Sequence, residues 1–216
     1  MQTPVFPRGT LGLMHRVKVR RVDDEVPVYD SGLVRSRSWV KNFARILGVN
    51  LASYSTGATG VVSWGGTDLA GGIRRYDGAW VASNYAVYTG SYPALQLHSP
   101  PSQAVYGILV GTGVGAPALS DYTLGTLIDH GGGAGALSYA DTVVESVVED
   151  GVTIDLLIWR SFSNTSGGSI TVNEIGLMAK HYYANSWSYF LIARDLLNFS
   201  IADGESATVE YVVRIS

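Results

Sequence analysis

The chain has 216 residues, enough to bury a hydrophobic core in one large or two small domains. Its net charge is −3, charged residues make up 15% of it against about 25% in an average protein, and cysteine is absent. The lack of cysteine excludes a disulfide framework and a thiolate metal site. So few charges favour a protein whose surface is partly buried against neighbouring subunits.

The positive charge is concentrated at the N-terminus. Residues 1–50 contain nine Lys or Arg and four Asp or Glu, a net charge of +5, whereas residues 51–216 carry a net charge of −8. Apolar and polar residues alternate from His15 to Val22, which predicts an amphipathic strand with one charged face. We expect residues 1–52 to form an arm that reaches a neighbouring acidic subunit. The cations that we expect to make this contact are Arg16, Lys18, Arg20 and Arg21.

Nucleic acid is the alternative partner of the basic segment. The acidic run Asp23-Asp24-Glu25 interrupts the segment, which therefore makes a poor track for phosphates. We predict no nucleic-acid binding.

A helix is expected after the basic strand, with Ser36 or Ser38 as its N-cap. Apolar residues with helical spacing follow on one face: Trp39, Phe43, Ile46 and Leu47. This face either closes the core of its own chain or packs on a partner subunit, and the sequence leaves both open. In the second case Trp39 and Phe43 anchor the contact.

Residues 53–102 differ in composition from the rest of the chain. Gly, Ser and Tyr dominate, and Pro100-Pro101 ends the segment because proline lacks an N–H donor and forces extended backbone. We interpret the segment as an insertion or loop region with short strands at 60–64 and 80–88. Its aromatic side chains favour a subunit interface, then core filling, then stacking on the sugar rings of a host-surface glycan. These residues are Trp80, Tyr85, Tyr88 and Tyr92.

We predict that residues 103–216 form the core of the protein, an antiparallel β-sandwich of jelly-roll-like type. Asp150-Gly151 is the strongest hairpin signal in the chain. Ser120-Asp121 precedes an expected short helix at 122–128, so the fold is mainly β with one or two short helices. Strands are expected at 104–110, 139–148, 152–163, 170–180, 189–195 and 207–215.

Four segments of this core form a recognisable succession: VGTG at 110–113, SDYTLGTLI at 120–128, SGGSITVNEIGL at 166–177 and FLIARD at 190–195. The succession resembles a group of structural proteins of tailed bacteriophages, and the resemblance covers residues 105–216. It implies a non-enzymatic virion building block, and we expect it in the tail, its fibre or the adsorption apparatus. Capsid decoration and a host-glycan-binding module are the alternatives.

The resemblance implies further copies of the chain and other virion proteins as partners, and assembly into the virion in the host cytoplasm. The N-terminus lacks the apolar segment of a secretory signal. No run approaches the roughly 20 apolar residues that span a bilayer. We therefore expect neither a secretion leader nor membrane insertion.

Motifs for chemistry are weak throughout the sequence. Gly111, Gly113 and Gly115 suggest a dinucleotide loop, but Pro117 stands where its helix would begin. A turn that requires positive φ is favoured instead. The four histidines are scattered, and no Gly-x-Ser-x-Gly elbow is present. We predict no catalytic, metal-binding or cofactor-binding residue, and a cell-wall hydrolase is disfavoured.

Overall fold

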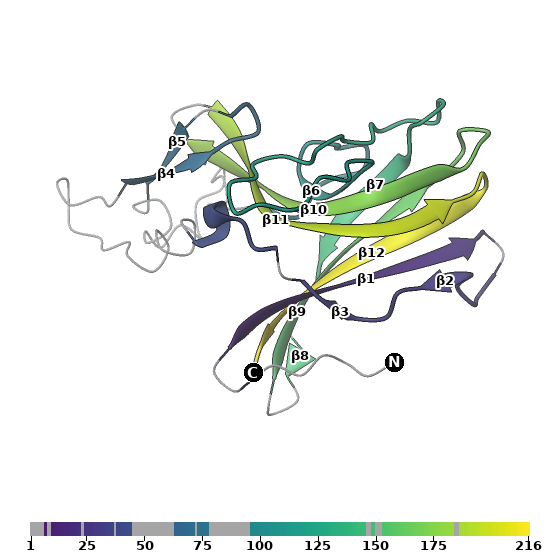
Figure 1. Ribbon diagram of the computed structural model, residues 1–216, viewed down its shortest axis with the longest axis horizontal. Helices are drawn as coiled ribbons and strands as arrows, with labels where there is room; N and C mark the ends of the chain where they lie inside the picture. Colours follow the sequence, from purple (N-terminus) through teal and green to yellow (C-terminus); the bar gives the residue numbers. More distant parts are fainter. Residues whose placement is uncertain are drawn as a thin grey trace.

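The structure is a computed structural model of the whole chain. It describes residues 7, 10–22, 24–36, 38–44, 63–71, 73–77, 96–145, 148–149, 153–183 and 186–216. Two antiparallel sheets of seven and three strands face each other as a β-sandwich, and a third, two-stranded sheet lies beyond one end of them (Figure 1). The predicted fold class is confirmed.

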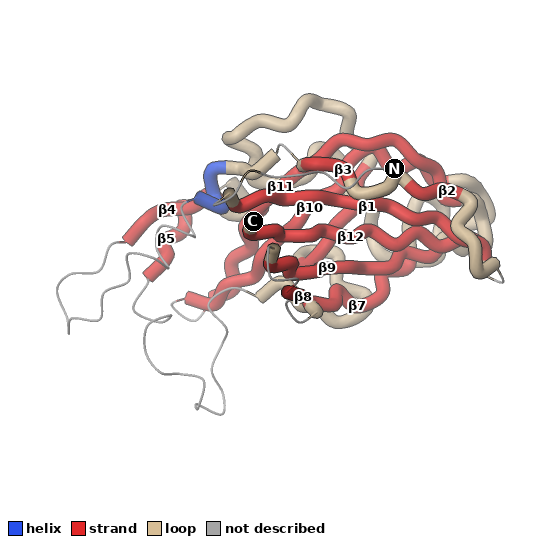
Figure 2. The backbone as a smooth tube through the Cα atoms, turned by 90° about the horizontal axis from the view of Figure 1, so that it is seen from below, coloured by secondary structure: helices blue, strands red, loops and turns tan. Residues whose placement is uncertain are grey.

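The larger sheet has the strand order β2-β1-β12-β9-β7, with β3 paired to β1 and β8 paired to β9. Figure 2 shows β1, β12 and β9 side by side across this sheet. Its strands are β1 (Leu11–Arg21), β2 (Tyr29–Asp30), β3 (Val34–Arg35), β7 (Ser138–Val144), β8 (Val148–Glu149), β9 (Ile154–Ser163) and β12 (Glu205–Ile215).

The smaller sheet has the order β11-β10-β6. The long hairpin of β10 and β11 provides most of it, and β6 pairs along the opposite edge of β10. The strands are β6 (Gly107–Gly111), β10 (Ile170–Tyr183) and β11 (Ser186–Ile201). The third sheet consists of β4 (Ser63–Thr67) and β5 (Ile73–Asp77), and one helical turn is described at 41–44.

The core lies between the two large sheets and follows from the two-residue period of strands. In β9, Ile158, Arg160 and Phe162 are buried while the residues between them are half-buried, because alternate side chains point to opposite faces. β9 therefore presents one fully buried face to the core and one half-buried face. The hairpin expected around Asp150-Gly151 agrees with the pairing of β8 to β9, although residues 150–152 lie outside the described residues.

The predicted N-terminal strand exists, but it is not an arm that crosses to a neighbour. β1 pairs with β12 of the same chain over its whole length, from Leu11↔Ile215 to Arg21↔Glu205. Its apolar residues Leu13, Met14, Val17 and Val19 are buried in the sandwich. The alternation that predicted a strand also supplied a core face, and that face is satisfied within the chain. Deletion of residues 1–35 is thus expected to prevent folding.

One side of the sandwich, where β6 meets β7, is closed by the fully buried Arg160. Its guanidinium donates hydrogen bonds to four backbone carbonyls, those of Gln103, Tyr106, Ile108 and Ala140, at 2.7 to 3.3 Å. Burial lowers the pKa of Arg160 to about 10. Because Tyr106 and Ile108 belong to the β6 region and Ala140 to β7, Arg160 ties the two sheets together.

The opposite side of the sandwich is formed by β11 and by the β1–β3 region, and the described residues 34–36 and 38–40 cross it. Val34 and Arg35 pair with β1 in the larger sheet. A few residues later, Val40 N–H donates to the carbonyl of Ile192 at 3.0 Å, and Arg194 N–H donates to the carbonyl of Ser38 at 3.2 Å. We call this side of the sandwich the seam.

Candidate functional site

Three of the four predicted interface cations are paired within their own chain. Arg16 binds Asp30 through two hydrogen bonds, which together with the nearby charge lower the pKa of Asp30 to about 2. Lys18 lies 2.7 Å from Glu210. Arg21 lies 3.5 Å from Glu205, and Arg20 is exposed near the end of β1.

Lys18 and Arg21 of the N-terminal segment therefore meet carboxylates of the acidic body inside one subunit. Arg16 pairs with Asp30 of its own segment. The expectation that these cations steer an arm to a neighbour does not hold for Arg16 and Lys18.

The predicted aromatic anchors divide into two groups. The rings of Trp39 and Phe43 stack with centroids 3.7 Å apart, and both side chains pack on the main core. Of the two roles considered for this face, the structure places both residues against their own core. The remaining anchors lie outside the described residues, so their roles stay predictions: Trp80, Tyr85, Tyr88 and Tyr92.

A buried carboxylate organises the loop that follows β6. Glu174 on β10 is fully buried. Its Oε1 accepts hydrogen bonds from the N–H groups of Gly113 and Thr126 at 2.9 Å, and its Oε2 accepts from Gly125 N–H at 3.0 Å. Arg194 Nε donates to Oε2 at 2.7 Å. Burial alone would raise the pKa of Glu174, but these bonds outweigh it and hold the pKa below its ordinary value.

Arg194 extends the same network along the loop. Its Nη1 donates to Asp121 Oδ2 and its Nη2 donates to the carbonyl of Gly115, both at 2.9 Å. Asp121 Oδ2 also accepts a hydrogen bond from Ala118 N–H at 2.9 Å. We call Glu174, Arg194 and Asp121 the clamp, and residues 112–126 the clamped loop.

The glycines at the start of the loop are explained by the clamp. None of Gly111, Gly113 and Gly115 has positive φ, so the predicted left-handed turn is wrong. A Cβ on Gly113 would lie 2.3 Å from Glu174 Oε1, and one on Gly111 would lie 2.5 Å from the carbonyl oxygen of Thr126. These two positions require glycine because the carboxylate and the returning chain approach the backbone closely.

The helix expected at 122–128 is absent, because the backbone of this segment bonds elsewhere. Ile128 N–H donates to the carbonyl of Val110, and Thr112 N–H donates to the carbonyl of Thr126. Gly125 and Thr126 donate their own N–H groups to Glu174. A helix would withdraw these donors and leave a buried carboxylate unsatisfied.

The clamp brings together the segments that carry the phage-like pattern. VGTG, SDYTLGTLI, NEIGL and FLIARD each supply at least one partner. The Glu174 oxygens and all three Arg194 nitrogens bond to groups of the same chain. This arrangement fixes the clamped loop against β10 and β11.

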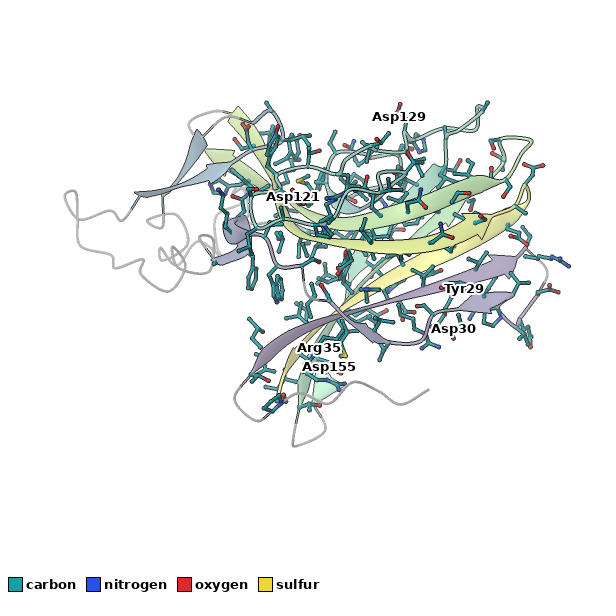
Figure 3. All side chains as sticks on the ribbon, viewed as in Figure 1. Tyr29, Asp30, Arg35, Asp121, Asp129 and Asp155 are labelled. Atoms are coloured by element: carbon teal, nitrogen blue, oxygen red, sulfur yellow. The ribbon has the colours of Figure 1, made fainter. Side chains whose placement is uncertain are left out.

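A second polar site lies at the seam, beside the clamp in sequence but on the other face of β11. A cleft of about 550 Å³ opens between residues 29–35 and residues 195–198 of β11, and His15 of β1 also lines it. Figure 3 labels Tyr29, Asp30 and Arg35 on this side of the molecule, with Asp121 and Asp129 on the opposite, upper side.

The buried Asp195 is the central polar group of this cleft. Its Oδ2 accepts hydrogen bonds from Ser36 Oγ at 2.9 Å and from Tyr211 OH at 3.3 Å. His15 Nε2 lies 4.0 Å from Asp195 Oδ1, beyond hydrogen-bond distance. Burial lowers the pKa of His15 despite the nearby carboxylate, and burial together with the same charge raises the pKa of Tyr211 well above its ordinary value.

The serine, histidine and aspartate of the seam do not form a catalytic triad. In a triad the histidine lies between the other two and removes the proton of the serine. Here Ser36 donates directly to Asp195, and His15 Nδ1 is buried without a partner among the residues that the structure describes. The seam therefore contains a buried polar cluster centred on the Asp195 carboxylate.

Sequence reasoning missed both polar sites. Glu174, Arg194 and Asp195 all lie in the quoted segments NEIGL and FLIARD, and a charged residue within an otherwise apolar strand is the signal that marks them. His15 and Ser36 carry no comparable signal, because their partner Asp195 is more than 150 residues away along the chain.

Comparison with known protein families, with curated proteins and with solved structures found no match to this chain. Over the described ranges, no group of three or more His, Cys, Asp or Glu side chains is arranged to hold a metal ion. The described helical segment is too short to cross a membrane.

Proposed function

We propose that the chain is a non-enzymatic structural protein of a tailed-bacteriophage virion, that it self-assembles or joins the particle through other virion proteins, and that it belongs to the tail, its fibre or the adsorption apparatus. Its place is the virion, after assembly in the host cytoplasm. The proposal begins from the phage-like succession of residues 105–216.

The single observation that carries the proposal is that the charged residues of this succession hold one loop of the same chain in place. These residues, Glu174, Arg194 and Asp121, bond to backbone groups of one loop and to each other. A residue pattern that fixes a loop serves a rigid building block, since an active site keeps at least one polar group for its substrate. The low charge content adds support, because assembly covers weakly charged surface.

Immunogold electron microscopy tests the location. Antibodies against the chain should label phage particles released by cells that carry its gene, and the label should lie on the tail. Label on the head would favour capsid decoration instead, and absence from purified particles would contradict the proposal.

Light scattering tests self-assembly independently. The purified chain at micromolar concentration should show a mass greater than that of one 23.1 kDa subunit. A monomer at every concentration, also in the presence of its virion partners, would contradict assembly through this chain.

A further inference from the structure

β11 is an edge strand of the smaller sheet, and the crossing segment covers only part of its free edge. The crossing segment 38–40 bonds to the carbonyl of Ile192 and to the N–H of Arg194. The peptide groups of these two residues therefore point away from β10, towards the free edge of β11. In an antiparallel strand the outward-facing peptide groups repeat every second residue, so those of Leu196 face the same edge. Among the residues that the structure describes, none pairs with them. Directly beyond the crossing segment, no described residue therefore occupies this edge of β11.

Apolar side chains flank this part of the edge. Leu196 is 39% exposed, Val34 is 41% exposed and Tyr29 is 40% exposed, and all three line the cleft. Tyr29 lies parallel to the buried Phe199 of β11, with ring centroids 6.3 Å apart. An extended segment placed in the cleft would bury these side chains and pair with the backbone of Leu196.

The charges of the cleft select one kind of side chain on that segment. Asp30 is occupied by Arg16 through two hydrogen bonds, and Arg35 is engaged in a contact of its own. Asp195 has neither a lysine nor an arginine within 4.0 Å in the described part of the chain, and no described residue donates a hydrogen bond to its Oδ1. A carboxylate with one unused acceptor, set in a largely buried position, matches a cationic donor.

Beside Asp195, the cleft contains a second polar side chain with an atom that no described residue pairs, that of His15. His15 is buried beside Asp195, and its Nδ1 has no hydrogen-bond partner among the described residues. In the neutral imidazole one nitrogen accepts a hydrogen bond and the other donates one. The structure therefore leaves His15 Nδ1 buried without a partner beside an Asp195 Oδ1 that accepts no hydrogen bond from a described residue. In the clamp on the same strand, by contrast, the Glu174 oxygens and the guanidinium nitrogens all have partners.

We propose that the seam is a docking site for an extended segment of a partner protein that carries one arginine or lysine, with its backbone paired to the β11 edge at Leu196 and its cation on Asp195. The segment would extend the smaller sheet beyond the point where residues 38–40 leave it. The cleft would take such a segment whether or not the chain is part of a virion, so particle labelling and peptide binding fail independently.

The probe is a set of acetylated and amidated pentapeptides with arginine at the centre and valine, leucine or threonine at the other positions. Each has a matched peptide with citrulline, which keeps the shape of arginine without its charge. Affinities are measured by NMR titration of the full chain. We expect the arginine peptides to bind at least about tenfold more tightly, a difference of about 1.4 kcal/mol, and the amide of Leu196 to become protected from hydrogen exchange.

The matched protein variants are Asp195→Asn and Asp129→Asn. Each removes one negative charge, but Asp129 is exposed and lies on the opposite side of the molecule (Figure 3). The first should abolish the preference for arginine over citrulline, and the second should leave it unchanged. Should Asp195→Asn fail to fold, the arginine and citrulline comparison on the native chain still decides.

Equal affinity for arginine and citrulline peptides, or no binding at millimolar concentration, would overturn the proposal. An arginine preference that persists in Asp195→Asn would overturn the assignment of the cation to Asp195. Binding without protection of the Leu196 amide would overturn the strand pairing.

Discussion

Arg194 and Asp195 are consecutive residues of β11 that point to opposite faces, and their surroundings differ completely. Arg194 joins the clamp, where the oxygens of Glu174 and the guanidinium nitrogens all have partners. Asp195 faces the seam, where its Oδ1 and His15 Nδ1 have none among the described residues. Burial of charged groups costs free energy at both sites. Only in the clamp do hydrogen bonds to every charged atom of Glu174 and Arg194 offset that cost. A polar network whose hydrogen-bonding groups are all satisfied stabilises a fold. A network with unsatisfied groups can still form hydrogen bonds with a partner.

Loss of the clamp carboxylate should have the largest effect on stability. Glu174→Ala removes the acceptor of three backbone N–H groups and leaves Arg194 buried beside a void. We expect the free energy of unfolding to fall by about 3–5 kcal/mol, measured by urea denaturation. Arg21→Ala is the control, since the Arg21 side chain is 69% exposed and its loss should cost less than about 1 kcal/mol. Similar small losses for both variants would show that the clamp is dispensable.

Crowding of the clamp gives the next largest effect. Gly113→Ala places a methyl group 2.3 Å from Glu174 Oε1, whereas a methyl group at Gly115 meets nothing within 4 Å. We expect Gly113→Ala to lower the free energy of unfolding by about 1–3 kcal/mol. Gly115→Ala should be near neutral or slightly stabilising, because it restricts the unfolded chain. Equal effects of the two substitutions on the urea midpoint would contradict the close approach of the carboxylate.

A smaller effect is expected at the seam from removal of one hydroxyl group. Tyr211→Phe deletes the hydrogen bond to Asp195 Oδ2 and keeps the buried ring. We expect a loss of about 0.5–1.5 kcal/mol in the free energy of unfolding. Tyr122→Phe, at a partly exposed ring on the clamped loop, serves as the control and should change stability by less than about 0.5 kcal/mol. A loss at Tyr211 as large as that of Glu174→Ala would remove the contrast between the two sites.

The smallest effect is a change in pH dependence. Burial lowers the pKa of His15 from its ordinary value of 6.5, so the unfolded chain binds this proton more readily than the folded chain. The contribution of His15 to stability is therefore present above pH 6.5 and is lost as the pH falls towards the folded-state pKa. In His15→Gln, the decline of the unfolding free energy below that pH should be shallower than in the native chain. Identical profiles would contradict the burial of a neutral imidazole at the seam.

Local pattern was sufficient for much of the fold. The alternation around Val17 and Val19 identified β1, and the Asp150-Gly151 turn identified the pairing of β8 with β9. Both signals rest on neighbours in sequence, which set the side-chain period and the turn. The same reasoning failed at 122–128, where the helix expected after Ser120-Asp121 would withdraw the backbone N–H donors that Glu174 requires.

The sequence by itself determined that this protein is an antiparallel β structure, because strand periodicity and turn chemistry are local properties. Only the tertiary structure decided that β1 completes its own sheet, since the partner strand β12 lies at the other end of the chain. It also decided the fates of Arg194 and Asp195, adjacent residues that strand alternation sends to opposite faces. In the sequence, Arg194 and Asp195 are simply two charged residues within an apolar strand, and nothing local distinguishes their surroundings. What separates them is which distant groups, Glu174 and the clamped loop or His15 and Ser36, the folded chain brings within hydrogen-bond reach.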